Sequence, residues 1–198
     1  MVERHLWRRD VRDARVLAAM ARVPRQAFVS ADARDQAYDD HPLEIGFGQT
    51  ISQPYVVAKT AELAEIAPGS RVLEIGAGCG YQTAVLLELG AEVRGIEIVG
   101  ELARGARERL EWLGYRKFQI REGDGYDGWP EAAPFDAIVL SAAPVELPPP
   151  LLEQLAEGGR LVGPVGRAEA QRLVRVTRRA EAFSREGFFP VRYVPMTG

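Results

Sequence analysis

Three glycines at alternate positions offer the clearest candidate binding site. Gly76, Gly78 and Gly80 follow directly after the apolar run of residues 71–75. Glycine lets the backbone approach a ligand closely and adopt conformations that other residues avoid. The dinucleotide pattern G-x-G-x-x-G would place its third glycine where this chain has Tyr81. The spacing therefore indicates a ligand other than a pyrophosphate, or a tight strand-to-helix turn that binds nothing.

Acidic residues accompany three apolar runs in this part of the chain. Glu74 precedes the glycines, Glu97 ends the next run, and an acid follows the third run within Gly123-Asp124-Gly125. An acid about 20 residues after such a turn accepts hydrogen bonds from the hydroxyls of a ribose. Each acid taken alone is equally consistent with a solvated strand end. Three acids in register with three strand ends favour a pocket for a nucleoside.

Short apolar strands and helices alternate through the same region. The predicted strands are residues 71–75, 92–97, 117–121, 135–141 and 160–165. The helices between them are residues 81–89, 101–113 and 150–156. Two further runs, 173–177 and 183–194, predict a terminal antiparallel pair. We therefore predict an α/β fold, a Rossmann-like doubly wound and mostly parallel sheet of about seven strands, with helices on both faces and an antiparallel C-terminal strand.

The N-terminal third has a different pattern. Residues 9–37 show a helical spacing of apolar residues, and Pro24 divides them into two short helices. The Gly and Pro content of residues 39–54 leads us to expect an irregular loop, and loops of this length are often functional. Residues 55–66 predict an amphipathic helix.

The length and composition fit one globular domain. The chain has 198 residues, of which 46% are hydrophobic and 27% charged, as in ordinary globular proteins. We expect a single domain, with residues 1–66 as an N-terminal helical cap and substrate loop and residues 67–198 as a Rossmann-like core. The formal net charge of −3 does not indicate a positively charged surface for nucleic acid, so we expect no nucleic-acid partner.

Residue counts argue against several other classes of protein. Cys79 is the only cysteine, so the chain forms no internal disulfide, which is compatible with a reducing cytosol. His5 and His41 lie far apart without neighbouring cysteines, so we expect no metal site. No apolar run is long enough to span a membrane, and the charged residues 1–5 do not predict a secretory signal. We expect a cytoplasmic protein that binds no membrane and acts as a monomer.

Several segments together resemble one enzyme family. Residues 22–29 and then residues 42–54, which end in Gly-Gln-Thr-Ile-Ser-Gln-Pro, are similar to the protein-L-isoaspartate O-methyltransferases. The glycine turn occurs in many methyltransferases, whereas residues 48–54 are specific to this family. The likeness continues through residues 73–81, 123–129, 151–166 and 194–198. It therefore extends over nearly the whole chain.

The resemblance implies a repair reaction. Such enzymes transfer the methyl group of S-adenosyl-L-methionine to the α-carboxyl of L-isoaspartyl residues in damaged proteins and peptides, and release S-adenosyl-L-homocysteine. The methyl ester then closes to a succinimide, which reopens partly to normal aspartate. The resemblance assigns Ser52 to the active site and places the acid of residues 123–125 against the adenine amino group. The expected cofactor-binding residues are Thr50, Ile51, Ser52, Glu74, Gly76, Ala77, Gly78, Gly80, Glu97, Ile98, Gly123, Asp124 and Gly125.

This chemistry agrees with what the sequence lacks. A carboxylate with a pKa of ~3.5 is already ionised at neutral pH and needs no general base. Donors near residues 50–52, at the start of a helix, could hold that anion. Alternatively, Ser52 is a helix N-cap beside a structural loop. Glu74, near Cys79, is acidic and does not favour a thiolate, so we interpret Cys79 as a packing residue.

Two other functions stay open on the sequence alone. One is an S-adenosylmethionine methyltransferase that acts on another substrate class, and the other is a non-catalytic nucleotide-binding module. Residues 46–54 distinguish these hypotheses, because a simple binding module would not need this segment and an enzyme would. Glu44 stands where the family pattern leads us to expect proline, and Phe47 replaces a commoner polar residue. Both changes would lie near the entrance for substrate.

Overall fold

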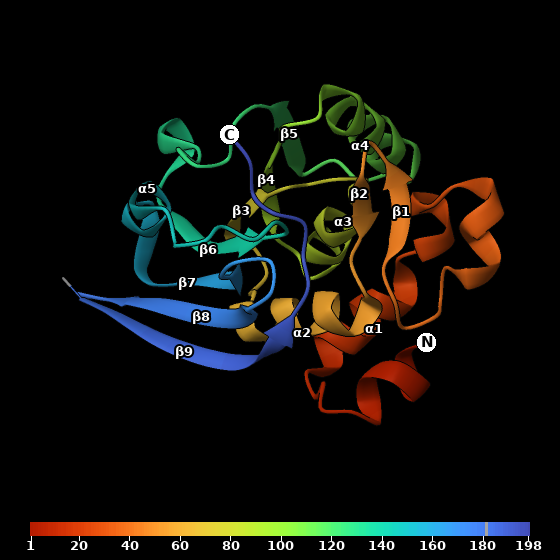
Figure 1. The fold of residues 1–198 in the computed structure, drawn as a ribbon, viewed down its shortest axis with the longest axis horizontal. Helices are drawn as coiled ribbons and strands as arrows, with labels where there is room; N and C mark the ends of the chain where they lie inside the picture. The colour runs from red at the N-terminus through yellow and green to blue at the C-terminus, as the bar shows by residue number, and fades with distance from the viewer. Residues whose placement is uncertain (181) are drawn as a thin grey trace.

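A seven-stranded sheet forms the centre of the protein (Figure 1). The computed structural model describes residues 1–180 and 182–198. Its strand order is β5-β4-β3-β6-β7-β8-β9. The first five of these run parallel, whereas β8 and β9 are antiparallel to their neighbours. The strands are β3 (Arg71–Ile75), β4 (Glu92–Glu97), β5 (Phe118–Glu122), β6 (Phe135–Leu140), β7 (Leu155–Val165), β8 (Gln171–Arg179) and β9 (Ala182–Val191). The predicted fold class is confirmed.

Helices cover both faces of this sheet. Four helices pack on one face around the larger apolar cluster, and a short fifth helix packs on the other face with the smaller cluster. They are α1 (Ala14–Arg22), α2 (Pro54–Ala64), α3 (Tyr81–Glu88), α4 (Gly100–Trp112) and α5 (Pro149–Glu153). Short 3-10 and π-helical turns complete the helical structure at η1 (Val2–Trp7), η2 (Arg25–Phe28), η3 (Ala31–Gln36) and η4 (Pro130–Ala132).

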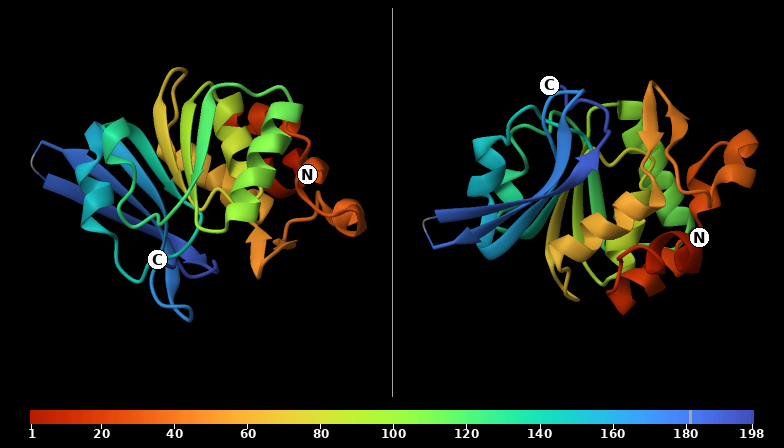
Figure 2. Two further views of the ribbon diagram at one scale, coloured as in Figure 1. Left: turned by 90° about the horizontal axis from the view of Figure 1, so that it is seen from above. Right: turned by 60° about the horizontal axis from the view of Figure 1, so that its bottom comes forward.

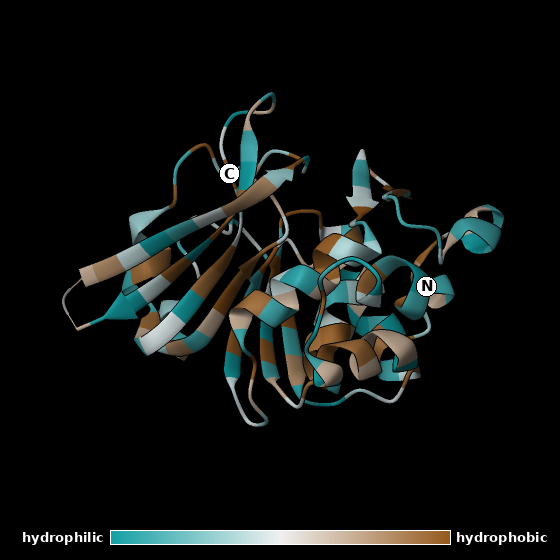
Figure 3. Cartoon of the chain, turned by 90° about the horizontal axis from the view of Figure 1, so that it is seen from below, coloured by the Kyte–Doolittle hydropathy of each residue, from teal (hydrophilic) through white to brown (hydrophobic). Residues whose placement is uncertain are grey.

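Successive strand residues supply the two apolar clusters in turn. Val72 and Val162 belong to the larger cluster, whereas their chain neighbours Leu73 and Leu161 belong to the smaller one. This alternation follows from the two-residue period of a strand, which sends successive side chains to opposite faces. Because helices cover both faces, both sets are apolar, and the central strands carry the hydrophobic colour in Figure 3.

The expectation of an irregular loop at residues 39–54 was wrong. This segment contains an antiparallel hairpin of β1 (Leu43–Gly46) and β2 (Gln49–Ile51). Gly46, Phe47 and Gly48 have φ values of 89°, 55° and 69°, so the glycines form the turn between the strands. The glycine content of this segment therefore reflects a hairpin turn between two short strands and not an absence of regular structure.

Other boundaries also differ from the prediction. The helix expected at 150–156 ends at Glu153, and β7 begins at Leu155 instead of residue 160. Residues 25–37 form two 3-10 helices in place of the second expected helix. The final strand ends at Val191, and the β8–β9 pair extends beyond the parallel part of the sheet (Figure 2). None of the helices in the described residues is long and apolar enough to cross a membrane.

Candidate active site

The glycine turn joins β3 to α3 and has the backbone that its sequence predicts. Gly76, Gly78 and Gly80 all have positive φ values, of 83°, 54° and 88°. The amides of Gly76 and Ala77 donate to the carbonyl of Ile96, at 2.8 and 3.1 Å, which ties the turn to the end of β4. Residues with a side chain rarely adopt these conformations, so glycine is required for this path.

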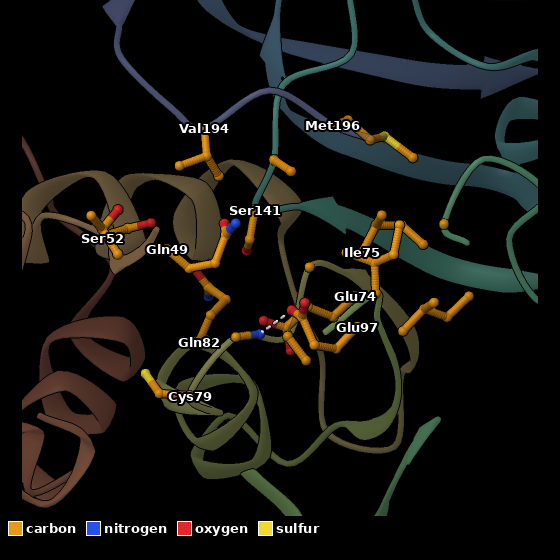
Figure 4. A pocket seen from close by; sticks show the side chains of 18 of the residues that line it. Gln49, Ser52, Glu74, Ile75, Cys79, Gln82, Glu97, Ser141, Val194 and Met196 are labelled. Carbon is orange, nitrogen blue, oxygen red and sulfur yellow. Dashed lines mark hydrogen bonds between the residues drawn. The ribbon is translucent and has the colours of Figure 1, made fainter. Parts of the chain in front are cut away.

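The carboxylate of Glu97 links the glycine turn to the next turn of the fold. Its Oε2 accepts a hydrogen bond from the Gly78 amide at 2.7 Å (Figure 4). Its Oε1 accepts one from the Val99 amide at 3.0 Å. The side chain is only 5% exposed and lines a pocket at the carboxyl ends of β3 and β4. Each oxygen has a second lone pair, so the group can still accept from the hydroxyls of a ribose.

Glu74 is a second carboxyl in the same pocket and is completely buried. Its Oε2 accepts from the Thr83 hydroxyl at 2.6 Å, while its Oε1 has no hydrogen-bond partner among the described residues. Burial raises the pKa of Glu74 to about 8, and the nearby charge of Glu97 acts in the same direction. Glu74 therefore holds a proton at neutral pH unless a cation comes close to it.

Most of the predicted cofactor residues come together around this pocket. Its lining includes Thr50, Ile51, Ser52, Glu74, Gly76, Ala77, Gly78, Glu97, Ile98, Gly123 and Gly125. Gly80 is outside the lining, because it starts α3 and lies against Leu110 of α4. Asp124 is also outside, and its Oδ1 accepts from the Tyr126 amide at 2.8 Å. The structure thus places Asp124 beside the pocket, between the lining residues Gly123 and Gly125.

Several residues of the lining were not among the predicted cofactor-binding residues. Gln82, in the first turn of α3, has a buried Nε2 with no partner among the described residues. Gln49, Ser141 and Met196 also line the pocket (Figure 4). The position of Gln82, two residues after the last glycine of the turn, is the one signal that could have indicated a role at the ligand.

The C-terminal segment closes one side of the pocket. Pro195 forms a β-bridge with Ala143, and the amide of Met196 donates to the Ala143 carbonyl at 2.9 Å. Residues 194–197 line the pocket as a result. Residues 194–198 are among the segments that carry the family likeness, and the structure places residues 194–197 at the pocket.

Ser52 lies between β2 and α2, at the junction of two cavities. It lines the pocket described above and also a second cavity of about 540 Å³, a size typical of ligand sites. The two cavities share Thr50, Ser52, Ser141 and Val194. A group bound in one cavity can therefore meet a group bound in the other beside Ser52.

The alternative role of Ser52 as a helix N-cap was wrong. The N-cap residue of α2 is Gln53, and the Gln53 side chain makes no capping hydrogen bond. Instead, Asp40 Oδ1 accepts from the Tyr55 amide at 3.1 Å, and Asp40 Oδ2 accepts from Gln53 Nε2 at 2.8 Å. The carboxylate of Asp40 thus does the capping from another segment, which leaves the Ser52 hydroxyl available at the junction.

Tyr193 and Cys79 complete the groups that could take part in chemistry. Burial raises the pKa of Tyr193 to about 12, with the hydroxyls of Ser52 and Thr60 acting in the opposite direction. Burial also raises the pKa of the Cys79 thiol, which agrees with a packing role. Within residues 1–180 and 182–198, His, Cys, Asp and Glu side chains form no group of three or more that could hold a metal ion.

Known structures with this fold define the class of protein. The chain matches a structure described as a putative protein-L-isoaspartate O-methyltransferase from Plasmodium falciparum in complex with S-adenosyl-L-homocysteine, with a TM-score of 0.85 and 27% identity over 99% of this chain and 96% of that one. A second structure, of a protein-L-isoaspartate O-methyltransferase, has a TM-score of 0.89 and 27% identity over 100% of this chain and 66% of that one. The fold and pocket are those of an S-adenosylmethionine-dependent methyltransferase.

Sequence comparisons narrow the class to a family. The model of the protein-L-isoaspartate(D-aspartate) O-methyltransferase family matches residues 1–198. Protein-L-isoaspartate O-methyltransferases of Gloeobacter violaceus and Opitutus terrae are each 54% identical over the whole chain, which covers 97% and 85% of their lengths. The chain therefore belongs to the protein-L-isoaspartate(D-aspartate) O-methyltransferase family, and the resemblance stated from its motifs is confirmed.

Proposed function

We propose that the pocket beside the glycine turn binds S-adenosyl-L-methionine and that the second cavity binds an L-isoaspartyl residue of a damaged protein. The enzyme transfers the methyl group to the α-carboxyl of that residue. The observation that carries this proposal is the meeting of the two cavities at Ser52, within the family's specific segment of residues 48–54. Methyl transfer needs its two reactants on opposite sides of one shared point.

The residues of the first pocket fit the cofactor. The two carboxyl groups, Glu74 and Glu97, favour a ligand that carries positive charge. The unpartnered Oε1 of Glu74 can accept from an ammonium, and the unpartnered Nε2 of Gln82 can donate to a carboxylate. Together they complement an amino-acid tail, while Glu97 is placed for the ribose. When bound, S-adenosylmethionine supplies a methyl group on a sulfonium, which is a good leaving group.

The residues around Ser52 need only position the substrate carboxylate. That group is ionised at neutral pH, so no side chain has to remove a proton. The Ser52 hydroxyl and the backbone amides of residues 50–52 can donate to it near the N-terminus of α2. Holding the two reactants in line can contribute about 7–11 kcal/mol to catalysis. These donors should bind the anion weakly enough for it to remain a nucleophile.

The expected product explains the biological purpose. The family resemblance implies that the methyl ester closes spontaneously to a succinimide, which then reopens partly to a normal aspartyl residue. Repeated cycles would return an isoaspartyl site to the ordinary backbone. The proposed role is therefore repair of aged proteins.

A paired peptide assay tests this function. Labelled S-adenosylmethionine is incubated with an L-isoaspartyl peptide and with the matched aspartyl peptide. We expect label to enter only the isoaspartyl peptide. In that residue the main chain continues through the side-chain carboxyl and leaves the α-carboxyl free, whereas in aspartate the α-carboxyl is part of the peptide bond. Equal labelling of both peptides, or labelling of neither, would exclude the repair function and favour another substrate class or a binding module.

Several further properties belong to the proposal. The single cysteine, Cys79, favours the cytoplasm, and the net charge of −3 argues against nucleic acid as a partner. We propose that residues 1–198 act as one domain and as a monomer. Residues 1–66 then serve as the helical cap and substrate segment on a core of residues 67–198.

A further inference from the structure

The second cavity has a charge pattern that the methyl transfer itself does not require. Its lining contains two cations, Arg9 and Arg192, and none of its described lining residues is acidic. We propose that this cavity selects isoaspartyl segments that have acidic neighbours, with Arg9 and Arg192 as the specificity-determining residues. This inference rests on the proposed function, because it names the class of peptide that the same site prefers.

The guanidinium of Arg9 is fixed in place beside the cavity. It stacks over the ring of Tyr55 at 3.5 Å from the ring centre, and its Nη1 donates to Asp40 Oδ2 at 3.0 Å. The Arg9 side chain is nevertheless 48% exposed. A guanidinium has five N–H donors, so one bond to Asp40 leaves most of them available to a ligand. The stack reduces the entropy that a ligand contact would otherwise cost.

Arg192 presents a positive charge that none of the described acidic side chains neutralises. It follows the end of β9 directly, is exposed, and forms no ion pair with any residue of 1–180 or 182–198. Arg175 of β8 differs, because it pairs with Glu186 at 2.8 Å. The free charge of Arg192 therefore acts on whatever segment enters the cavity.

The rest of the lining suits an extended peptide. Tyr55 and Phe189 form an aromatic pair with ring centres 5.5 Å apart, and Tyr193 lies between Arg192 and the shared residue Val194. Aromatic surfaces of this kind give sequence-tolerant contact area. Charge is thus the main feature by which this cavity can tell one flanking residue from another. An acidic flank would be attracted to the two arginines, and a lysine flank would be repelled.

Flanking charge can be varied without touching the reacting group. We would measure kcat/KM at low salt for isoaspartyl peptides that differ only in having glutamate, alanine or lysine on both sides. We expect the glutamate peptide to exceed the lysine peptide by about tenfold. The ratio should shrink towards one as the salt concentration rises, because exposed charges are screened.

Charge reversal at Arg192 provides the decisive variant. Arg192→Glu should bring the glutamate-to-lysine ratio to one or below. Arg185→Glu is the matched control, because Arg185 is an exposed residue of β9 outside the cavity lining. Unchanged affinity for S-adenosyl-L-homocysteine would show that both variants are folded. Arg9→Gln should weaken the preference in the same direction as Arg192→Glu.

The outcomes separate this inference from the proposed function. If the wild-type ratio stays within twofold, or if Arg185→Glu alters it as much as Arg192→Glu, the selectivity is wrong although repair stands. If none of the three isoaspartyl peptides is methylated, the proposed function fails and the selectivity with it. A preference that disappears in Arg192→Glu and persists in Arg185→Glu supports the inference.

Discussion

The two cavities that meet at Ser52 are built in opposite ways. The cofactor pocket takes its main polar groups from one short stretch, Glu74 to Glu97, where β3, the glycine turn and β4 follow one another. The substrate cavity combines Arg9 and the hairpin region with residues 189–194, which lie near the other end of the chain. The glycines and carboxyl groups of the first follow from local sequence, although residues 49–52 and 194–197 also line that pocket. The second cavity exists only when distant segments pack together.

The two cavities also differ in charge. The cofactor pocket holds two carboxyl groups, Glu74 and Glu97, and the substrate cavity holds two guanidinium groups, Arg9 and Arg192. The proposed ligands have complementary charges, since S-adenosylmethionine carries positive charge and the proposed substrate is a peptide segment with acidic flanks. By charge, each cavity is therefore suited to one of the two proposed ligands and poorly suited to the other. Four variants test this division.

Glu97→Ala should have the largest effect, confined to the cofactor side. It removes the acceptor for the Gly78 and Val99 amides and for the ribose. We expect the Kd for S-adenosyl-L-homocysteine, measured by titration calorimetry, to rise about 100-fold. Glu97→Gln keeps one acceptor oxygen and should lose less. Glu92→Ala, at the exposed start of the same strand, is the control and should bind normally; equal losses in both would refute the role of Glu97.

Ser52→Ala tests the point that the two cavities share. Loss of a hydrogen bond to a charged group should lower kcat/KM for an isoaspartyl peptide by about 10- to 100-fold. The free energy of unfolding should change by less than about 0.5 kcal/mol, because Ser52 does not cap α2. Cofactor affinity should remain close to that of the wild type. Unchanged activity in this variant would remove Ser52 from the catalytic site.

The buried Glu74 makes stability depend on pH on the cofactor side. Its pKa is about 8 in the folded protein against an ordinary value of 4.5, so the unfolded chain loses the proton first as the pH rises. The free energy of unfolding of the ligand-free enzyme should therefore fall between about pH 4.5 and pH 8, by about 1–2 kcal/mol from pH 5 to pH 7.

Glu74→Gln removes this titration and provides the comparison. Urea unfolding of the two proteins at pH 5, 7 and 8.5 should give a stability difference that moves in favour of the variant as the pH rises. A difference that is constant over this range would mean that Glu74 titrates normally in the fold.

Asp40→Ala should have the smallest effect, on the substrate side. The variant loses the cap on the Tyr55 amide, the bond from Gln53 and the ion pair with Arg9. We expect the free energy of unfolding to fall by about 1–2 kcal/mol in urea. Asp39→Ala is the neighbouring control, because the Asp39 side chain is 61% exposed and its ionic partner, His41, is 3.9 Å away. Similar losses in both variants would contradict the capping role of Asp40.

The cofactor side could be predicted closely from the sequence, and the substrate side could not. The glycine turn, the strand that ends at Glu97 and the acid at Glu74 all lie where their spacing indicated. By contrast, the β1–β2 hairpin was mistaken for an irregular loop. A glycine in a hairpin turn and a glycine in a loop look alike in a sequence, and only strand pairing distinguishes them.

The sequence by itself determined the alternation of strands and helices, the positive-φ path at Gly76–Gly80 and the family, because each depends on residues that are neighbours in the chain. Tertiary structure alone decided that Asp40 caps α2, that Gln82 faces the pocket and that Asp124 stands beside it. It also decided that Arg9 and Arg192 share one cavity. The physical reason is that such contacts join segments far apart in sequence, whose meeting is fixed by the packing of the whole core.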